Sequence, residues 1–171
     1  MIDDSVFIAK GVVISGDVGI GKDSSVWYNT VIRGDMGPIR IGDSTNIQDL
    51  TMVHVDEGKP CTIGSRVSIG HRAILHGCVV EDDCLIGMGA ILLNGVHVGA
   101  GSVVGAGAVV TEGTSIPPGS LALGIPAQVV RSVDDVLKQN IESTWRHYLK
   151  EADNYRNGKV TVRKSEKDDG A

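Results

Sequence analysis

The feature that most constrains this chain is an apolar residue that recurs every six positions. In the second half it falls at Val80, Ile86, Leu92, Val98, Val104, Val110, Ile116 and Ala122. The same spacing occurs upstream at Ile14, Ile20, Val26 and Ile32, then at Ile41, Ile47 and Val53, and again at Ile63, Ile69 and Leu75. A period of six fits neither an α-helix nor the alternation of a long strand. It predicts an all-β solenoid, a coil of short strands that turns every six residues and points one apolar side chain inward each time.

Composition supports this prediction and excludes several function classes. Aromatic residues make up only 4% of the chain while glycines number 23, so the core must consist of small aliphatic side chains. A net charge of −5 without a long basic run argues against nucleic acid as a partner. No apolar run approaches the roughly 20 residues that a membrane helix needs. The N-terminus lacks the plan of a signal peptide, and three cysteines without a CxxC motif suit a reducing compartment. We therefore expect a cytoplasmic protein.

The chain divides into three parts. Residues 1–130 carry the hexapeptide repeats and are predicted to form the β-helix domain. Residues 131–157 are predicted to form a C-terminal amphipathic helix, with Ser132 as the N-cap and Asp134 and Asp135 in the first turn. Apolar residues follow helical spacing there, at Val133, Val136, Leu137, Ile141, Trp145, Tyr148, Leu149, Ala152 and Tyr155. Residues 158–171 are charged, and we expect a disordered tail.

The repeat also predicts which side chains are neighbours. Rungs three apart lie one coil apart, at about the 4.8 Å spacing of paired strands. Counting rungs places His54 and His76 at the same position in successive coils, with Arg33 one coil earlier. His71 falls on the preceding face, with Asp49 directly beneath it. A residue on another face does not easily reach the stacked pair, so the simplest third ligand comes from a neighbouring subunit, and three-fold closure predicts a homotrimer.

Three of the five histidines lie within 23 consecutive residues. Three neutral imidazoles with one open position are the usual layout of a catalytic zinc site. Three-histidine sites also suit other divalent ions such as iron or cobalt, and affinity order alone does not select zinc. We therefore predict a metal site, with zinc as the expected ion, formed by His54, His71 and His76.

At this point the chain resembles the gamma-class carbonic anhydrases and their short-loop relatives over roughly residues 5–157. The matching residues are Arg33-Gly34-Asp35, Asn46-Ile47-Gln48-Asp49, His54, Gly70-His71 and Leu75-His76-Gly77. The resemblance implies a left-handed parallel β-helix with three rungs per coil. It also implies a metal that His54 and His76 of one subunit share with His71 of the next. In such an enzyme zinc lowers the pKa of a bound water, and the resulting hydroxide attacks carbon dioxide to give bicarbonate.

The resemblance assigns further roles. Gln48 would orient the metal-bound water, and Asp49 would support His71 from behind. Arg33 and Asp35 resemble a pair that makes salt bridges across the subunit interface.

This sequence departs from the well-studied family members at two places that concern acid–base groups. Met36 stands where well-studied members carry a glutamate, and the loop from Val55 to Pro60 is shorter than theirs. Glu57 stands three residues after His54, which is the spacing of the proton-shuttle residue after the matching histidine in those members. Tyr148 is the best candidate for the place of their C-terminal asparagine. These departures put fast hydration in question and leave the metal site as predicted.

Two other functions remain open on the sequence. A hexapeptide acyltransferase using a coenzyme A thioester would share the ending Gly124-Ile125-Pro126, but it typically uses one histidine as general base, which leaves two unexplained. A metal-stabilised, non-catalytic trimer with weak esterase activity is the other alternative. Metal analysis and hydration kinetics distinguish these two functions from that of a carbonic anhydrase.

Overall fold

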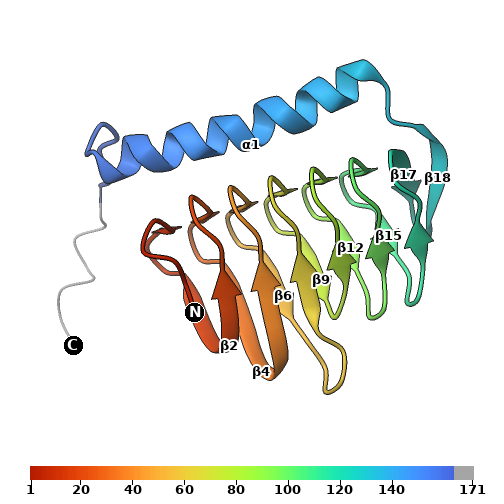
Figure 1. The fold of residues 1–171 in the computed structure, drawn as a ribbon, viewed down its shortest axis with the longest axis horizontal. Coiled ribbons are helices and arrows are strands. Elements are labelled where there is room, and N and C mark those ends of the chain that lie inside the picture. Colours follow the sequence, from red (N-terminus) through yellow and green to blue (C-terminus); the bar gives the residue numbers. More distant parts are fainter. Residues whose placement is uncertain (164–171) are drawn as a thin grey trace.

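A computed structural model describes residues 1–163, which form a solenoid of short strands and one long helix (Figure 1). The strands are β1 Phe7–Ile8, β2 Val13–Ile20, β3 Ser25–Val26, β4 Val31–Ile41, β5 Asn46–Ile47, β6 Met52–His54, β7 Cys61–Ile63, β8 Ser68–Ile69, β9 Ile74–His76, β10 Val79–Val80, β11 Leu85–Ile86, β12 Ile91–Leu92, β13 His97–Val98, β14 Val103–Val104, β15 Val109–Val110, β16 Ser115–Ile116, β17 Ser120–Gly124 and β18 Ala127–Ser132. The helix is α1 Asp135–Arg156.

Parallel pairing between successive coils builds the faces of the solenoid. One face runs β1-β3-β5-β8-β11-β14-β17-β18. The long strand β4 joins the other two faces, because Val31–Arg33 pairs with β6 while Ile39–Ile41 pairs with β7. From there one face continues through β9, β12 and β15, and the other through β10, β13 and β16. The predicted left-handed parallel β-helix of hexapeptide repeats is confirmed.

The six-residue repeat supplies the core, as predicted. Its apolar residues point inward and stack in three columns. From Val26 to Ala122 nearly all of them are less than 2% exposed, including Ile47, Leu75 and Leu92. The three cysteines are free and buried. Burying one aliphatic side chain of this size contributes about 1.5–3 kcal/mol, so the columns hold successive coils in register.

The solenoid ends in a reversal that the sequence did not indicate. After the turn at Gly124 the chain pairs back on itself, since β18 runs antiparallel to β17. This pairing keeps the backbone extended through Ser132, so the prediction of Ser132 as the N-cap is wrong. The N-cap is Asp134, whose side chain accepts a hydrogen bond from the Leu137 amide at 2.9 Å.

Helix α1 lies along the coils and runs back toward the N-terminal end (Figure 1). It packs against β3, β5 and β8. Of its predicted apolar face, Ile141 and Ala152 are buried, but Val136 is exposed. No helix among residues 1–163 is long and apolar enough to cross a membrane. Most of the tail predicted to be disordered, residues 164–171, lies outside the described residues.

Candidate metal centre

Two of the three histidines meet on one face of the solenoid. His54 ends β6 and His76 ends β9, and the two are directly paired in register, as rung counting predicted. His54 Nδ1 lies 3.0 Å from His76 Nε2. Their side chains are 13% and 27% exposed, so the facing nitrogens lie in a shallow, partly screened site. Arg33 pairs with His54 one coil earlier, again as predicted.

The outer nitrogens of both rings face oxygen acceptors. His54 Nε2 lies 3.1 Å from an Asp35 carboxylate oxygen, and His76 Nδ1 lies 2.9 Å from the amide oxygen of Asn94. Because a neutral imidazole carries its hydrogen on one nitrogen only, the tautomers that donate to both oxygen acceptors leave a lone pair on each inner nitrogen. Two lone pairs facing each other at 3.0 Å need a proton or a metal cation between them. The donor set of this pair therefore fits a metal ion.

Asp35 is held in its ionised, accepting form. The Arg33 guanidinium donates to it at 2.5 Å and is the main cause that lowers the pKa of this carboxyl, with His54 adding a smaller effect. The sequence predicted that Arg33 and Asp35 bridge two subunits. In the single chain they pair with each other, both roughly 40% exposed, and Asp35 also holds His54. The interface role stays a prediction.

His71 lies on a different face, in the turn after β8. Its Nδ1 lies 2.8 Å from Asp49, which stands directly beneath it as predicted. Its Nε2 accepts from the Tyr148 hydroxyl at 3.2 Å. Burial, and secondarily the charge of Asp49, raise the pKa of Tyr148 to about 12, so this hydroxyl keeps its proton. His71 thus resembles the pair in having one nitrogen on an acceptor, but the lone pair of its other nitrogen accepts from Tyr148.

Gln48 is buried beneath His71, and both ends of its amide are engaged. Its oxygen accepts from the His71 backbone amide at 3.2 Å, and its nitrogen donates to Asn46 at 3.1 Å. Asn46 in turn donates to Ser68 at 2.8 Å. In the single chain Gln48 therefore fixes the turn that carries His71. Its predicted role of orienting the metal-bound water stays a prediction.

The loop after His54 contains two carboxylates in different situations. Glu57, the predicted proton shuttle, is exposed and makes no hydrogen bond or ion pair with the described part of the chain. Asp56 accepts from the Asn94 amide at 2.8 Å and reaches within 3.9 Å of His76 Nε2. Asn94 and Asp56 are the site residues that sequence reasoning missed. Rung counting could have found Asn94, because Leu92 pairs with Leu75, which places Asn94 over Gly77.

No three histidine, cysteine, aspartate or glutamate side chains within residues 1–163 gather closely enough to hold a metal ion. One chain brings His54 and His76 together and leaves His71 apart. Completion of the site by a second subunit stays a prediction.

Comparisons with known proteins identify the family of this chain. The family described as "Bacterial transferase hexapeptide (six repeats)" matches residues 77–112, and "Hexapeptide repeat of succinyl-transferase" matches residues 58–93. A "Probable carbonic anhydrase" of Methanocaldococcus jannaschii is 55% identical over 88% of this chain and 94% of its own length. A "Carbonic anhydrase" of Geobacillus kaustophilus is 47% identical over 89% of this chain and 84% of its own. The chain belongs to the gamma-class carbonic anhydrase-like family.

Solved structures place this carbonic anhydrase-like chain beside proteins with other names. A hexapeptide transferase family protein from Anaplasma phagocytophilum is 37% identical, with a TM-score of 0.87 over 90% of this chain and 91% of its own. The β-helix is therefore common to both groups, and the activity has to be argued from the side chains on it.

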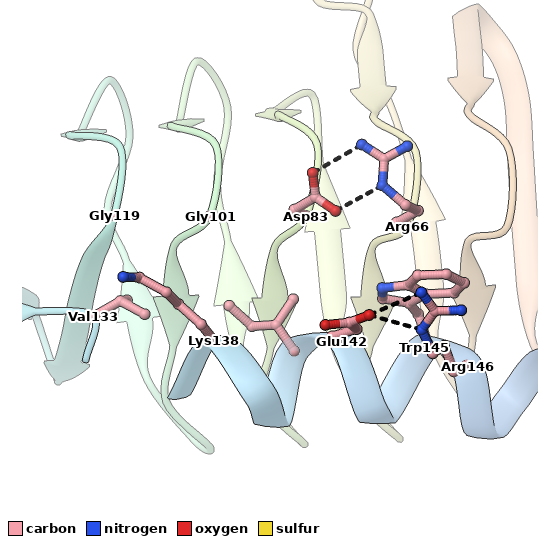
Figure 2. A pocket seen from close by; sticks show the side chains of 10 residues that line it. Arg66, Asp83, Gly101, Gly119, Val133, Lys138, Glu142, Trp145 and Arg146 are labelled. Carbon is pink, nitrogen blue, oxygen red and sulfur yellow. Dashed lines mark hydrogen bonds and ion pairs between the residues drawn. The ribbon is translucent and has the colours of Figure 1, made fainter. Parts of the chain in front are cut away.

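A groove elsewhere on this carbonic anhydrase-like chain offers no competing chemistry. It encloses about 480 Å³ between α1 and the turns of the later coils (Figure 2). Four of its charged side chains pair with each other: Arg66 with Asp83 at 2.7 Å, and Arg146 with Glu142 at 2.8 Å. The fifth, Lys138, pairs with Asp135 at 3.0 Å. The groove is otherwise mainly apolar, and no histidine lines it.

Proposed function

We propose that this protein is a metal-dependent carbonic anhydrase that converts carbon dioxide and water into bicarbonate and a proton. His54 and His76 of one subunit and His71 of a neighbour in a homotrimer would hold the ion, with zinc the expected metal and iron or cobalt possible. The observation that carries the proposal is the 3.0 Å approach of His54 Nδ1 to His76 Nε2, with the other nitrogen of each ring facing an oxygen acceptor. The names of the relatives support the same reaction.

The three histidines share a design that supports metal binding. Asp35, Asn94 and Asp49 each accept from one ring, which fixes its orientation and leaves the other nitrogen as a ligand. Metal-binding histidines are commonly held in this way. A divalent ion bound here would supply the Lewis acidity that brings the pKa of water toward neutrality, the known behaviour of carbonic anhydrases.

The remaining side chains would orient groups and move the proton. Tyr148 donates to the lone pair with which His71 would bind the ion, so metal binding would displace this hydrogen bond, and the raised pKa of Tyr148 would keep the released hydroxyl a donor. Gln48 would keep the His71 turn in place. Glu57 is exposed and unengaged, which suits a group that carries the released proton to solvent, while Asp56 is held by Asn94.

Substitution of His71 tests the proposal. His71→Ala should abolish both stoichiometric zinc binding, measured by elemental analysis, and carbon dioxide hydration, measured by stopped flow. His97→Ala is the matched control, because His97 pairs with Glu81 on another face and should leave both unchanged. Full zinc content in His71→Ala would overturn the assignment.

The second candidate is a hexapeptide acyltransferase, which the name of the Anaplasma relative favours. Such an enzyme would need one histidine as general base and no metal. Chelated, metal-free protein that still transfers an acetyl group from acetyl coenzyme A would support this function. Loss of carbon dioxide hydration on chelation and its return with zinc would support the anhydrase.

A further inference from the structure

Asn94 lies outside every histidine motif, yet its side chain joins two parts of the site. It follows β12, one coil beyond His76. Its amide oxygen faces His76 Nδ1 at 2.9 Å, and its amide nitrogen donates to Asp56 at 2.8 Å. The result is a continuous chain of contacts from His76 through Asn94 to the loop that follows His54.

The Asp56 carboxylate fixes which way this amide points. With the amide turned over, its oxygen would face a carboxylate oxygen at 2.8 Å, which is repulsive, and its NH₂ group would face His76. The observed orientation satisfies both neighbours. His76 Nδ1 is therefore the donor, and His76 Nε2 keeps the lone pair that faces His54.

The backbone gives the Asn94 side chain a fixed place. Asn94 stands over Gly77, and a Cβ on Gly77 would lie 2.2 Å from the Asn94 amide oxygen. Gly77 also has a φ of +56°, a conformation that L-residues rarely adopt. The Asn94 carbonyl accepts from the Gly113 amide at 2.9 Å, and the Gly95 amide donates to the Gly77 carbonyl at 2.8 Å. The backbone that carries this side chain is thus anchored from the coils on both sides.

We propose that Asn94 is a positioning residue of the metal centre, which acts on two groups at once. Its oxygen holds His76 in the tautomer that presents Nε2 to the metal. Its nitrogen holds Asp56, and with it the loop of residues 55–60, against the site. This inference rests on the proposed function for the identity of the ion, whereas the tautomer and the order of the loop are properties of the protein without metal.

Two substitutions separate these effects. Asn94→Leu removes both contacts, and we expect zinc affinity, measured by chelator competition, to fall about 10–100-fold, the usual cost of losing a group behind a metal ligand. Asn94→Asp keeps an acceptor for His76 but places a second carboxylate against Asp56. Its zinc affinity should stay within a few-fold of the parent, while endoproteinase Glu-C should cleave after Glu57 faster than in the parent. Asn140→Asp, on the exposed side of α1, is the matched control for both readouts.

A rescue and a spectroscopic measurement exclude a merely structural role. The exchange Asn94→Asp with Asp56→Asn restores one amide facing one carboxylate, and it should return the resistance to Glu-C. In metal-free protein, ¹⁵N NMR should show His76 protonated at Nδ1, and Asn94→Leu should lose this preference. An unchanged His76 tautomer together with zinc affinity within twofold in Asn94→Leu would overturn the inference. Failure of the parent protein to bind zinc would overturn the proposed function instead, and the tautomer and cleavage readouts would still decide the role of Asn94.

Discussion

The division of the three histidines between subunits can be tested by mixing two inactive chains. One chain carries His71→Ala and keeps the pair of His54 and His76, and the other carries His54→Ala and keeps His71. Each alone should bind no zinc at a three-histidine site. In a closed ring each site takes the pair from one subunit and His71 from the next. A site is intact only when the first chain supplies the pair and the second supplies His71.

Random assembly of equal amounts fixes the expected recovery. Each of the two conditions holds in half of the cases, so about a quarter of all sites should be complete, in trimers of either mixed composition. Zinc content and hydration rate of the unfractionated co-expressed protein should both reach roughly a quarter of the parent. Mixed trimers purified through two different tags should reach roughly a third, because each holds one complete site out of its three. Combining both substitutions in one chain, mixed with itself, is the control and should give none. No recovery in purified mixed trimers would refute a shared site, because it would mean that all three ligands must come from one chain.

Two further predictions concern the scaffold and the helix. Leu75→Ala should lower the free energy of unfolding by about 2–5 kcal/mol in urea denaturation, since Leu75 is fully buried in the core. The neighbouring Ile74→Ala, at a position 38% exposed, should lower the free energy of unfolding by less than about 1 kcal/mol. Equal losses in the two variants would contradict the assignment of Leu75 to the core and Ile74 to the surface. Tyr148, with its pKa raised to about 12, should titrate last when absorbance at 295 nm is followed, and Tyr148→Phe should remove that step. Because the pKa of Tyr148 is raised in the folded state, its contribution to the free energy of unfolding is fully present below the unfolded pKa near 10. That contribution is lost as the pH rises through about 12. A titration curve that is unchanged in Tyr148→Phe would contradict the burial of this hydroxyl.

Much of the fold and of the candidate site could be predicted from spacing alone. Parallel strands that stack coil on coil keep register, so a residue count places His76 over His54 and His71 over Asp49. The same count places Asn94 over Gly77. It cannot show that the Asn94 side chain reaches His76, because that contact depends on the space above Gly77 and on the Asp56 carboxylate that orients the amide.

The predicted start of the C-terminal helix was wrong for a related reason. Ser132 is a good N-cap by residue type, and Asp134 and Asp135 suit a first turn. Pairing of β18 with β17 overrides that local preference, and only the reversal at Gly124 brings the two strands together. Within one chain Arg33 pairs with Asp35, and Asp35 also contacts His54.

The course of α1 has a consequence for how this protein can change its length. A solenoid ordinarily gains or loses coils freely, because each repeat contacts only its neighbours. Here α1 begins beyond the last coil and returns far enough for Tyr148 to reach His71 and for Arg156 to reach Ser5. One extra coil after β8 would add about 4.8 Å to the path, or about three helical residues. The length of α1 therefore restricts the number of coils: a duplicated coil would carry Tyr148 away from His71 unless α1 grew by nearly one turn in the same step.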